Sequence, residues 1–445
     1  MKAGWREWLL VMTSLAVGYM FLEVVYRAYL YYSYAIETQY RVTTTNARMY
    51  PQIGGIPGNI VGEYEPSRMM TLRLYEKDNR LLRENQAPIN NLGWVSRINY
   101  SRTKPSREYR IAIVGDSMTA SANNNLPWPD VVQRHLNADS ELLARLGVDH
   151  ISVINLGVIG ASMQYMANPL SLIARRFSAD MIVVNFIVED LRRRHSDDFA
   201  NIPQDPLSPP SDEEVRAVGL GPHITINGVD VGLNCASWPF KPSNPTCQPS
   251  AVWYVPPEIQ LDANDLLAVK QKAARELLWY RLILSTEPLA LMEVIGRPVI
   301  PNPRRPLVVK KLVELERPFI SPGIISAEED EKVALDVLQF IRTLHKNMLI
   351  LHNPVYWYMT GERPTPMLDK FIGLAKQANI EIVRMEKYLP FEKGEPEWRR
   401  WYNLPQDGHW SDYGAELYGE AVYRVIRDKL TDDVSPSRKQ TATLK

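Results

Sequence analysis

The sequence predicts an α/β fold, a three-layer α/β/α sandwich built on a central parallel sheet. Short β-branched runs alternate with helix-patterned segments over residues 105–195 and again over 326–430. The runs are apolar throughout, which is typical of strands that helices cover on both faces. Regular alternation of strands and helices indicates crossover connections between parallel strands rather than hairpins.

Each element follows from the spacing of its apolar residues. The first part of the domain predicts strands at 111–115, 150–157 and 180–188, with helices at 130–146 and 163–177. The second part predicts helices at 326–347, 366–378 and 411–430, with strands at 348–354 and 380–385. Ser326 and Glu329 fit a capping box, and Ser411 is the expected N-cap of the last helix.

The segment between the two parts, residues 196–325, breaks this pattern. Residues 203–257 contain 11 prolines, which excludes a regular strand–helix–strand unit. Aromatic residues are too frequent for a plain linker, so we expect an ordered cap, with a helical stretch at 262–295. Its aromatic residues either pack the cap or stack on sugar rings: Trp238, Trp253, Tyr254 and Trp279. Residues 29–104 are interpreted as a stalk and lead-in, and 431–445 as a flexible tail.

The composition excludes several classes of function. Among 445 residues, 51 are Lys or Arg and 51 are Asp or Glu, so no net charge favours nucleic acid as a partner. The two cysteines, Cys235 and Cys247, are too few for a disulfide scaffold or a cysteine zinc site; they form one local disulfide or remain separate thiols. No phosphate-binding loop, dinucleotide glycine signature or metal-ligand spacing is present, so we expect no cofactor and no metal.

Residues 8–28 predict a transmembrane anchor. The run from 8 to 25 is predominantly apolar with Glu23 as its only charge, and its length suits a bilayer core. Lys2 and Arg6 precede it and several tyrosines follow it, which places residues 1–7 in the cytoplasm and the main domain outside. The alternative is a cleaved signal peptide with a small-x-small site at 33–35, although that site lies well beyond the apolar run.

The candidate chemistry lies at two positions far apart in the sequence. Ser117 lies two residues after the first predicted strand, and Asp407 and His409 lie just before the last helix. Sites in parallel sheets form at the carboxyl ends of strands, where this topology brings both segments together. A serine hydroxyl needs a general base to act as a nucleophile, and a histidine oriented by a carboxylate is such a base. We therefore expect a triad of Ser117, His409 and Asp407.

Four sequence blocks resemble those of SGNH (GDSL-like) hydrolases. IAIVGDSMTAS (111–121) resembles the first block, NLGVIGAS (155–162) the second, NFIVEDL (185–191) the third, and DGHWSDYG (407–414) the last. The last block has the Asp-x-His-Trp form of membrane-anchored bacterial and alginate-acetylation-type relatives. The resemblance implies a flavodoxin-like SGNH fold, an ester as substrate, and an oxyanion hole formed by the backbone N–H groups of Ser117 and Gly160.

The third block departs from the family pattern. Where the family carries an asparagine that donates to the oxyanion, this chain has Glu189, followed by Asp190. An ionised carboxylate repels an oxyanion, so Glu189 acts as a donor only when protonated. The alternatives are a substitute donor, Asn185, or a structural role for Glu189 in an ion pair with Arg192–Arg194.

Two further features carry less information. His352 ends a predicted strand, where it either lines the cleft or serves as a hydrogen-bonded structural residue. The basic run 192–195 either meets an acidic substrate group or forms a solvated face.

The sequence thus predicts a membrane-anchored serine esterase or O-acyltransferase that acts on an acylated carbohydrate of the envelope or exterior. The expected location is the bacterial inner membrane, with one span through 8–28 and the main domain in the periplasm or outside. The alternative is a catalytically weakened protein that binds glycans or assembles a polysaccharide-processing complex. The acyl group, the glycan and any protein partner are not specified by the sequence.

Overall fold

The computed structural model describes residues 42–48, 64–76, 78–191, 223–233, 252–279, 327–359, 366–390, 396–403 and 408–433, with scattered positions before 42 and residue 62. Five strands form a sheet in the order β11–β10–β6–β4–β5, and every neighbouring pair is parallel. Their bounds are β4 Glu108–Gly115, β5 His150–Gly157, β6 Met181–Phe186, β10 Met348–His352 and β11 Val383–Arg384. Numbered along the chain this order is 2-1-3-4-5, which confirms the predicted α/β fold.

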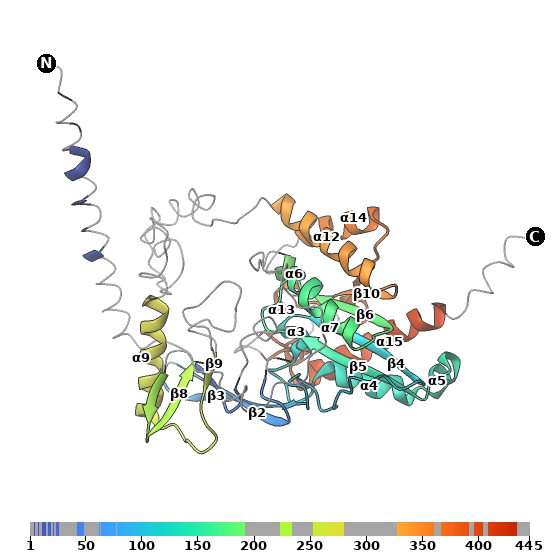
Figure 1. Ribbon diagram of the computed structural model, residues 1–445, viewed down its shortest axis with the longest axis horizontal. Helices are drawn as coiled ribbons and strands as arrows, with labels where there is room; N and C mark the ends of the chain where they lie inside the picture. The colour runs from blue at the N-terminus through green and yellow to red at the C-terminus, as the bar shows by residue number, and fades with distance from the viewer. Residues whose placement is uncertain are drawn as a thin grey trace, which may run out of the picture.

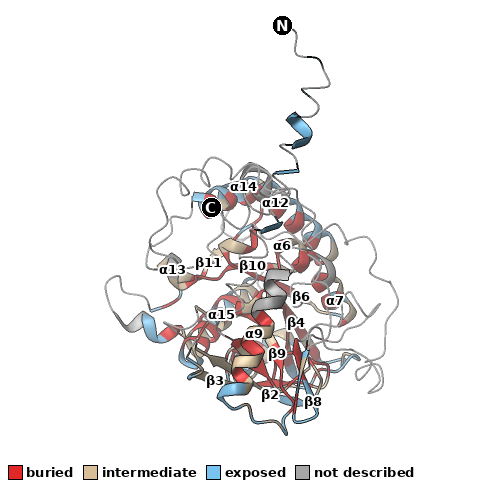
Figure 2. Cartoon of the chain, turned by 90° about the vertical axis from the view of Figure 1, so that its left-hand side faces the viewer, coloured by how far each residue is buried: buried red, intermediate tan, exposed pale blue. Residues whose placement is uncertain are grey.

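Helices cover both faces of this sheet, as Figure 1 shows for α12 and α14 on one side and α4 and α5 on the other. One core joins alternate strand residues to α7 (Ser171–Arg176), α12 (Ala327–Leu344) and α14 (Pro366–Gln377). The other core joins the intervening strand residues to α4 (Trp128–Ala138), α5 (Ser140–Leu146) and α15 (Asp412–Asp433). Buried residues accordingly concentrate in the strands and the inner helix faces (Figure 2).

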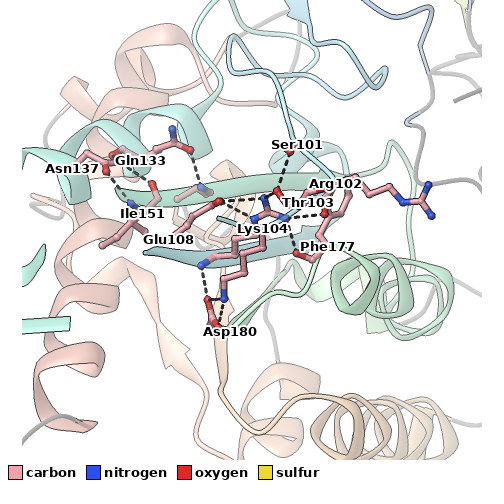
Figure 3. Close-up of polar contacts among 12 residues, drawn as sticks. Ser101, Arg102, Thr103, Lys104, Glu108, Gln133, Asn137, Ile151, Phe177 and Asp180 are labelled. Atoms are coloured by element: carbon pink, nitrogen blue, oxygen red, sulfur yellow. Dashed lines mark hydrogen bonds and ion pairs between the residues drawn. The ribbon is translucent and has the colours of Figure 1, made fainter. Parts of the chain in front are cut away.

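The edge strand β5 is protected by side chains that occupy its outward backbone groups (Figure 3). Asn137 of α4 accepts from the N–H of Ile151 at 2.9 Å and donates to its carbonyl at 2.7 Å. Gln133 accepts from the N–H of Val153 at 2.7 Å. An unprotected strand edge invites pairing with another chain, and these amides block that pairing.

A buried arginine closes the amino-terminal end of the sheet, opposite the carboxyl ends of the strands. Arg110 is 1% exposed, and its Nε donates to Glu108 at 2.7 Å. Its guanidinium also donates to the carbonyls of Thr103 at 2.9 Å and Phe177 at 2.8 Å. A buried charge is stable only when its hydrogen bonds are made, and this cluster makes them; Figure 3 labels the acceptors Thr103, Glu108 and Phe177.

A second, six-stranded sheet has the order β3–β2–β1–β9–β8–β7. β1 (Val42–Thr45), β2 (Arg68–Tyr75) and β3 (Leu81–Ile89) come from the lead-in. β7 (His223–Ile226), β8 (Val229–Leu233) and β9 (Val252–Tyr254) come from the insertion. The two groups meet where β1 pairs in parallel with β9, and α9 (Ala263–Trp279) shares a core with the insertion strands.

No pattern in the sequence predicted that the lead-in and the insertion share one sheet. Figure 1 shows β2, β3, β8, β9 and α9 grouped beside the α/β part of the chain. Trp253 and Tyr254 are buried in this group, which favours packing over sugar stacking for both residues. Cys235, Cys247 and Trp238 lie outside the described residues, so their roles stay predictions. The predicted domain boundaries stay predictions as well.

Several predicted elements differ from the structure in their bounds or their regularity. The expected helix 130–146 is two helices, because Asp139 leaves the helical conformation and accepts from the N–H of Leu142 to cap α5. The expected strand 380–385 shortens to β11 and turns into a 3₁₀ helix at Met385–Lys387. The predicted helix 163–177 is continuous but contains a π turn at Met166–Leu170.

The predicted anchor, residues 8–28, is described only in part. Each described residue from 8 to 25 is helical and exposed. In the part of the chain that the structure describes, no helix has both the length and the apolar character needed to cross a membrane.

Candidate active site

Ser117 lies at the carboxyl end of β4, next to the point between β4 and β6 where the strand order reverses. In sheets of this order, ligands bind in the crevice outside that point. Asp116 accepts from the N–H of Met118 at 2.9 Å and caps the short helix α3 (Ser117–Ala120). Gly115 allows α3 to fold back onto the sheet, because a Cβ there would lie 2.0 Å from Thr119 Oγ1 and 2.6 Å from the Asn185 carbonyl oxygen. Ser117 itself is half-buried.

His409 is held by a short antiparallel pairing of two loop segments. Tyr402 and Trp410 form an isolated bridge, and the N–H of Asn403 donates to the carbonyl of His409 at 2.9 Å. The Asn403 side chain donates to the carbonyl of Trp410 at 2.6 Å. Ser411 accepts from the N–H of Gly414 at 3.1 Å, which confirms its predicted role as N-cap of α15. The loop therefore enters the helix in one defined geometry.

Ser117 and His409, 292 positions apart in the sequence, meet at the carboxyl ends of the strands. His409 Nε2 lies 2.8 Å from Ser117 Oγ, within hydrogen-bond distance, and both side chains are half-buried. This is the distance that proton transfer from a serine hydroxyl to a histidine requires. Asp407, the predicted third member, lies outside the described residues.

The candidate oxyanion site lies on the loop that follows β5. The N–H of Val158 donates to the Gly115 carbonyl at 3.0 Å, which ties this loop to the end of β4. Gly160 has φ +77°, a conformation that glycine adopts without strain. At the start of the loop, Gly157 brings β5 close to α3, since a Cβ there would lie 2.1 Å from the Ala120 nitrogen. Ser117 and Gly160 thus both lie just beyond the carboxyl ends of the neighbouring strands β4 and β5.

Glu189 lies in the 3₁₀ turn Val188–Leu191, directly after β6. Asp190 is buried and closes this turn by accepting from the N–H of Ile187 at 2.9 Å. Glu189 is half-buried. The arginines proposed as its alternative partners, 192–194, lie outside the described residues, so both interpretations of Glu189 stay predictions.

Asn185 has its side-chain contacts inside the protein. The side chain is fully buried, its Nδ2 donates to Thr119 Oγ1 at 2.7 Å, and its Oδ1 accepts from the Tyr418 hydroxyl at 2.6 Å. These contacts give Asn185 a place in the packing behind Ser117. They do not favour the suggested role of substitute oxyanion donor.

His352 is also fully buried, beside the carboxylate of Glu386. Its Nδ1 lies 3.5 Å from Glu386 Oε2, and its ring packs against Phe186 with centroids 5.7 Å apart. Burial by itself would raise the pKa of Glu386, but hydrogen bonding and charge from His352 and a hydrogen bond from Arg384 outweigh it and lower the pKa to about 2. These contacts support the structural interpretation of His352.

A stack of aromatic rings lies behind His409, and sequence reasoning did not identify it. Trp410 is 1% exposed and lies between Tyr402, with centroids 4.6 Å apart, and Tyr418, 4.9 Å apart. Trp128 meets Tyr418 edge-on at 5.0 Å and donates to the Met118 carbonyl at 2.8 Å. The tryptophan after the histidine in DGHW was the only available signal in the sequence.

The second sheet contacts the loops of this site. Ala122 packs in the core of β2 and β3, and Ile159 of the Gly160 loop packs against that core. Asn125 accepts from the N–H of Gln86 at 2.6 Å, and its own N–H donates to Asp412 at 2.8 Å. The loop after Ser117 is therefore held between the second sheet and the start of α15.

Among the described residues no group of histidines, cysteines or carboxylates could hold a metal ion.

No protein-family model matches the chain, and no curated protein matches it in sequence. Its fold is similar to several solved structures. One is a lipase/acylhydrolase from Enterococcus faecalis, at 12% identity and TM-score 0.30, covering 72% of this chain and 96% of that one. Another is a catalytic mutant of Axe2, an acetylxylan esterase from Geobacillus stearothermophilus, at 12% identity and TM-score 0.33, covering 71% and 93%.

A third is the family 3 carbohydrate esterase of Clostridium thermocellum, at 10% identity and TM-score 0.30, covering 74% of this chain and 100% of that one. Likenesses of this size do not bear on the reaction of this chain. The geometry of Ser117, His409 and the strand ends around them is compatible with nucleophilic catalysis.

Proposed function

We propose that this chain is a serine esterase or O-acyltransferase of the SGNH type. The observation that carries the proposal is the 2.8 Å contact between His409 Nε2 and Ser117 Oγ at the carboxyl edge of the parallel sheet. A serine that begins a helix directly after a strand, beside a histidine from a distant loop, has the arrangement of an activated nucleophile. The four sequence blocks that resemble those of SGNH hydrolases follow one another along this chain in the family's order, from the block of Ser117 to the block of His409.

The reaction begins with attack by Ser117 on an ester carbonyl. Ser117 Oγ forms a bond to the carbonyl carbon while its proton passes to His409 Nε2, and the carbonyl oxygen becomes an oxyanion. The backbone N–H groups of Ser117 and Gly160 donate to that oxyanion. His409 then gives the proton to the leaving alkoxide, which departs as an alcohol and leaves an acyl group on Ser117.

The acyl group then passes to a second acceptor. His409 takes a proton from water or from a sugar hydroxyl, and the oxygen of that acceptor attacks the acyl carbon. Collapse of the second tetrahedral intermediate returns the proton to Ser117 and releases an acid or a new ester. Asp407 holds the Nδ1 proton of His409, so that Nε2 faces the serine.

The proposed substrate is an acylated carbohydrate outside the cytoplasm. The likeness of the blocks to those of membrane-anchored bacterial relatives supports a carbohydrate ester. The apolar run 8–25, whose described residues are helical and exposed, supports an anchor in the inner membrane with the main domain in the periplasm or outside.

An acetyl-ester assay tests this function. Wild-type protein is expected to release acetate from an acetylated oligosaccharide, and Ser117→Ala is expected to abolish the release. Adding a second, unacetylated oligosaccharide separates transfer from hydrolysis, because a transferase gives an acetylated acceptor in place of free acetate. Equal release by wild type and Ser117→Ala would refute the proposal.

One observation favours a second function, that of a glycan-binding component with weakened catalysis. A carboxylate, Glu189, stands after β6 where the family carries a neutral donor, and the loss of one oxyanion donor costs about 10²–10³ in rate. Binding of an acetylated oligosaccharide without Ser117-dependent turnover would favour this second function.

A further inference from the structure

One buried side chain contacts both the residues that pack behind Ser117 and the residue that follows His409. Tyr418 is fully buried in α15, the helix that begins three residues after His409. Its hydroxyl and its ring point to different partners: the hydroxyl to the network behind Ser117, the ring to the residue next to His409.

The hydroxyl begins a chain of hydrogen bonds to the nucleophile helix. Tyr418 donates to Asn185 Oδ1 at 2.6 Å, and Asn185 Nδ2 donates to Thr119 Oγ1 at 2.7 Å. Thr119 lies in α3 two residues after Ser117, and it packs so closely on the end of β4 that Gly115 must lack a side chain. Loss of the Tyr418 hydroxyl is therefore expected to alter the packing of α3, the turn that carries Ser117.

The ring of Tyr418 supports the histidine loop. It stacks on Trp410 with centroids 4.9 Å apart and planes 24° apart, and Trp128 closes its edge. Trp410 follows His409 directly and is held on its other face by Tyr402. Because both faces of the indole are covered, close packing resists displacement of the backbone on which Trp410 and the adjacent His409 lie.

The phenol stays neutral and remains a donor at all ordinary pH values. Burial, with the neighbouring Tyr402, Asp116 and Glu386 as further causes, raises the pKa of Tyr418 well above its usual range. The buried carboxamide of Asn185 is matched to this donor on one side and to a hydroxyl acceptor on the other. Tyr418→Phe would preserve the ring stack and leave the Asn185 oxygen without its donor.

We propose that Tyr418 is a positioning residue, which sets the distance between Ser117 Oγ and His409 Nε2 through Asn185–Thr119 on one side and Trp410 on the other. The inference rests on the proposed function, since it concerns the same pair of reacting groups. A residue that acts only on stability lowers the fraction of folded enzyme. A positioning residue lowers the turnover of each folded active site.

Active-site titration separates these two effects. The fraction of active protein in each variant is counted by complete labelling of Ser117 with a fluorophosphonate, and kcat and KM for an acetyl ester are then expressed per labelled site. The variants are Tyr418→Phe and Thr119→Val, with Thr119→Ser as the conservative variant that keeps the hydroxyl. Tyr423→Phe is the matched control, because this tyrosine is also in α15 and loses a hydrogen bond, 3.0 Å to Asp139, away from the site.

We expect kcat per labelled site to fall on the order of tenfold in Tyr418→Phe and Thr119→Val, with KM changed by less than about twofold. Thr119→Ser is expected to recover the rate, and Tyr423→Phe to match wild type. The double variant Tyr418→Phe/Thr119→Val is expected to be no slower than either single variant, because both break one chain.

Wild-type kcat per labelled site in Tyr418→Phe, or an equal fall in Tyr423→Phe, would overturn the inference while leaving the proposed function intact. Absence of Ser117-dependent labelling in wild-type protein would overturn the proposed function, and this inference with it.

Discussion

Gly157 is the position where a single added carbon most directly tests the geometry of the site. In Gly157→Ala the new Cβ would lie 2.1 Å from the Ala120 nitrogen, 2.5 Å from the Thr119 carbonyl carbon and 2.6 Å from the Ala120 Cα. All three atoms are backbone atoms, so no flexible side chain can move aside. Ordinary contact requires about 3.4 Å or more, so α3 must shift by roughly 1 Å or the substitution is not accommodated.

The shift has two expected consequences. Forcing a methyl group into a packed junction costs about 1–3 kcal/mol of unfolding free energy. Because Ser117 begins α3, its Oγ is displaced from His409 Nε2, and a misplacement of about 1 Å costs on the order of 10² in rate. The assays are urea unfolding, and kcat for an acetyl ester per fluorophosphonate-labelled site.

The matched control is Gly373→Ala. Gly373 lies within α14, where an added Cβ would have no neighbour within 4 Å. Alanine is a better helix former than glycine, so this variant is expected to gain about 0.5–1 kcal/mol with unchanged turnover. If Gly157→Ala behaves like Gly373→Ala in both assays, the close approach of β5 to α3 does not position the nucleophile, and the reasoning is refuted.

Three further predictions follow from the site and its support. Glu189→Asn is expected to raise kcat by about tenfold or more if the carboxylate faces the oxyanion, because it restores a neutral donor; an unchanged rate would place Glu189 outside the hole. Asp412→Ala removes the acceptor for the N–H and side chain of Asn125, at 2.8 and 2.9 Å. It is expected to lower the free energy of unfolding in urea by about 1–2 kcal/mol and to reduce kcat; if both stay unchanged, these hydrogen bonds are dispensable. Glu386 has a folded-state pKa of about 2, below its unfolded value, so its contribution to stability is present above pH 4.5 and is lost as pH falls toward 2. Unfolding of Glu386→Gln is therefore expected to depend less on pH than that of wild type between pH 4.5 and 2; identical pH dependence would contradict the shift.

Much of the α/β domain could be predicted because its signals are local. The apolar strand 150–157 and the N-cap Ser411 each follow from a few adjacent residues, and the structure reproduces both. The break at Asp139 was missed because apolar spacing continues across it, whereas its cap on Leu142 and its ion pair with Arg427 at 2.6 Å are matters of three-dimensional contact.

The second sheet and the support behind the site could not be predicted for a related reason. β1 and β9 pair across some 200 residues, and neither strand is long enough to give a clear pattern. Tyr418 has the spacing of an ordinary core residue in an amphipathic helix. Its partner Asn185 is one polar residue in an apolar strand, and the sequence could not show whether it faced the site or the core.

The central claim is that Ser117 is a nucleophile activated by His409. It is tested most directly by reaction with a small fluorophosphonate, diisopropyl fluorophosphate, followed by mass spectrometry of the peptide that contains residue 117. The account predicts one adduct on Ser117 in wild-type protein, a rate of modification lower by orders of magnitude in His409→Gln, and no adduct on that peptide in Ser117→Ala. An adduct on Ser117 that forms equally fast without His409, or no adduct at all in folded wild-type protein, would contradict it.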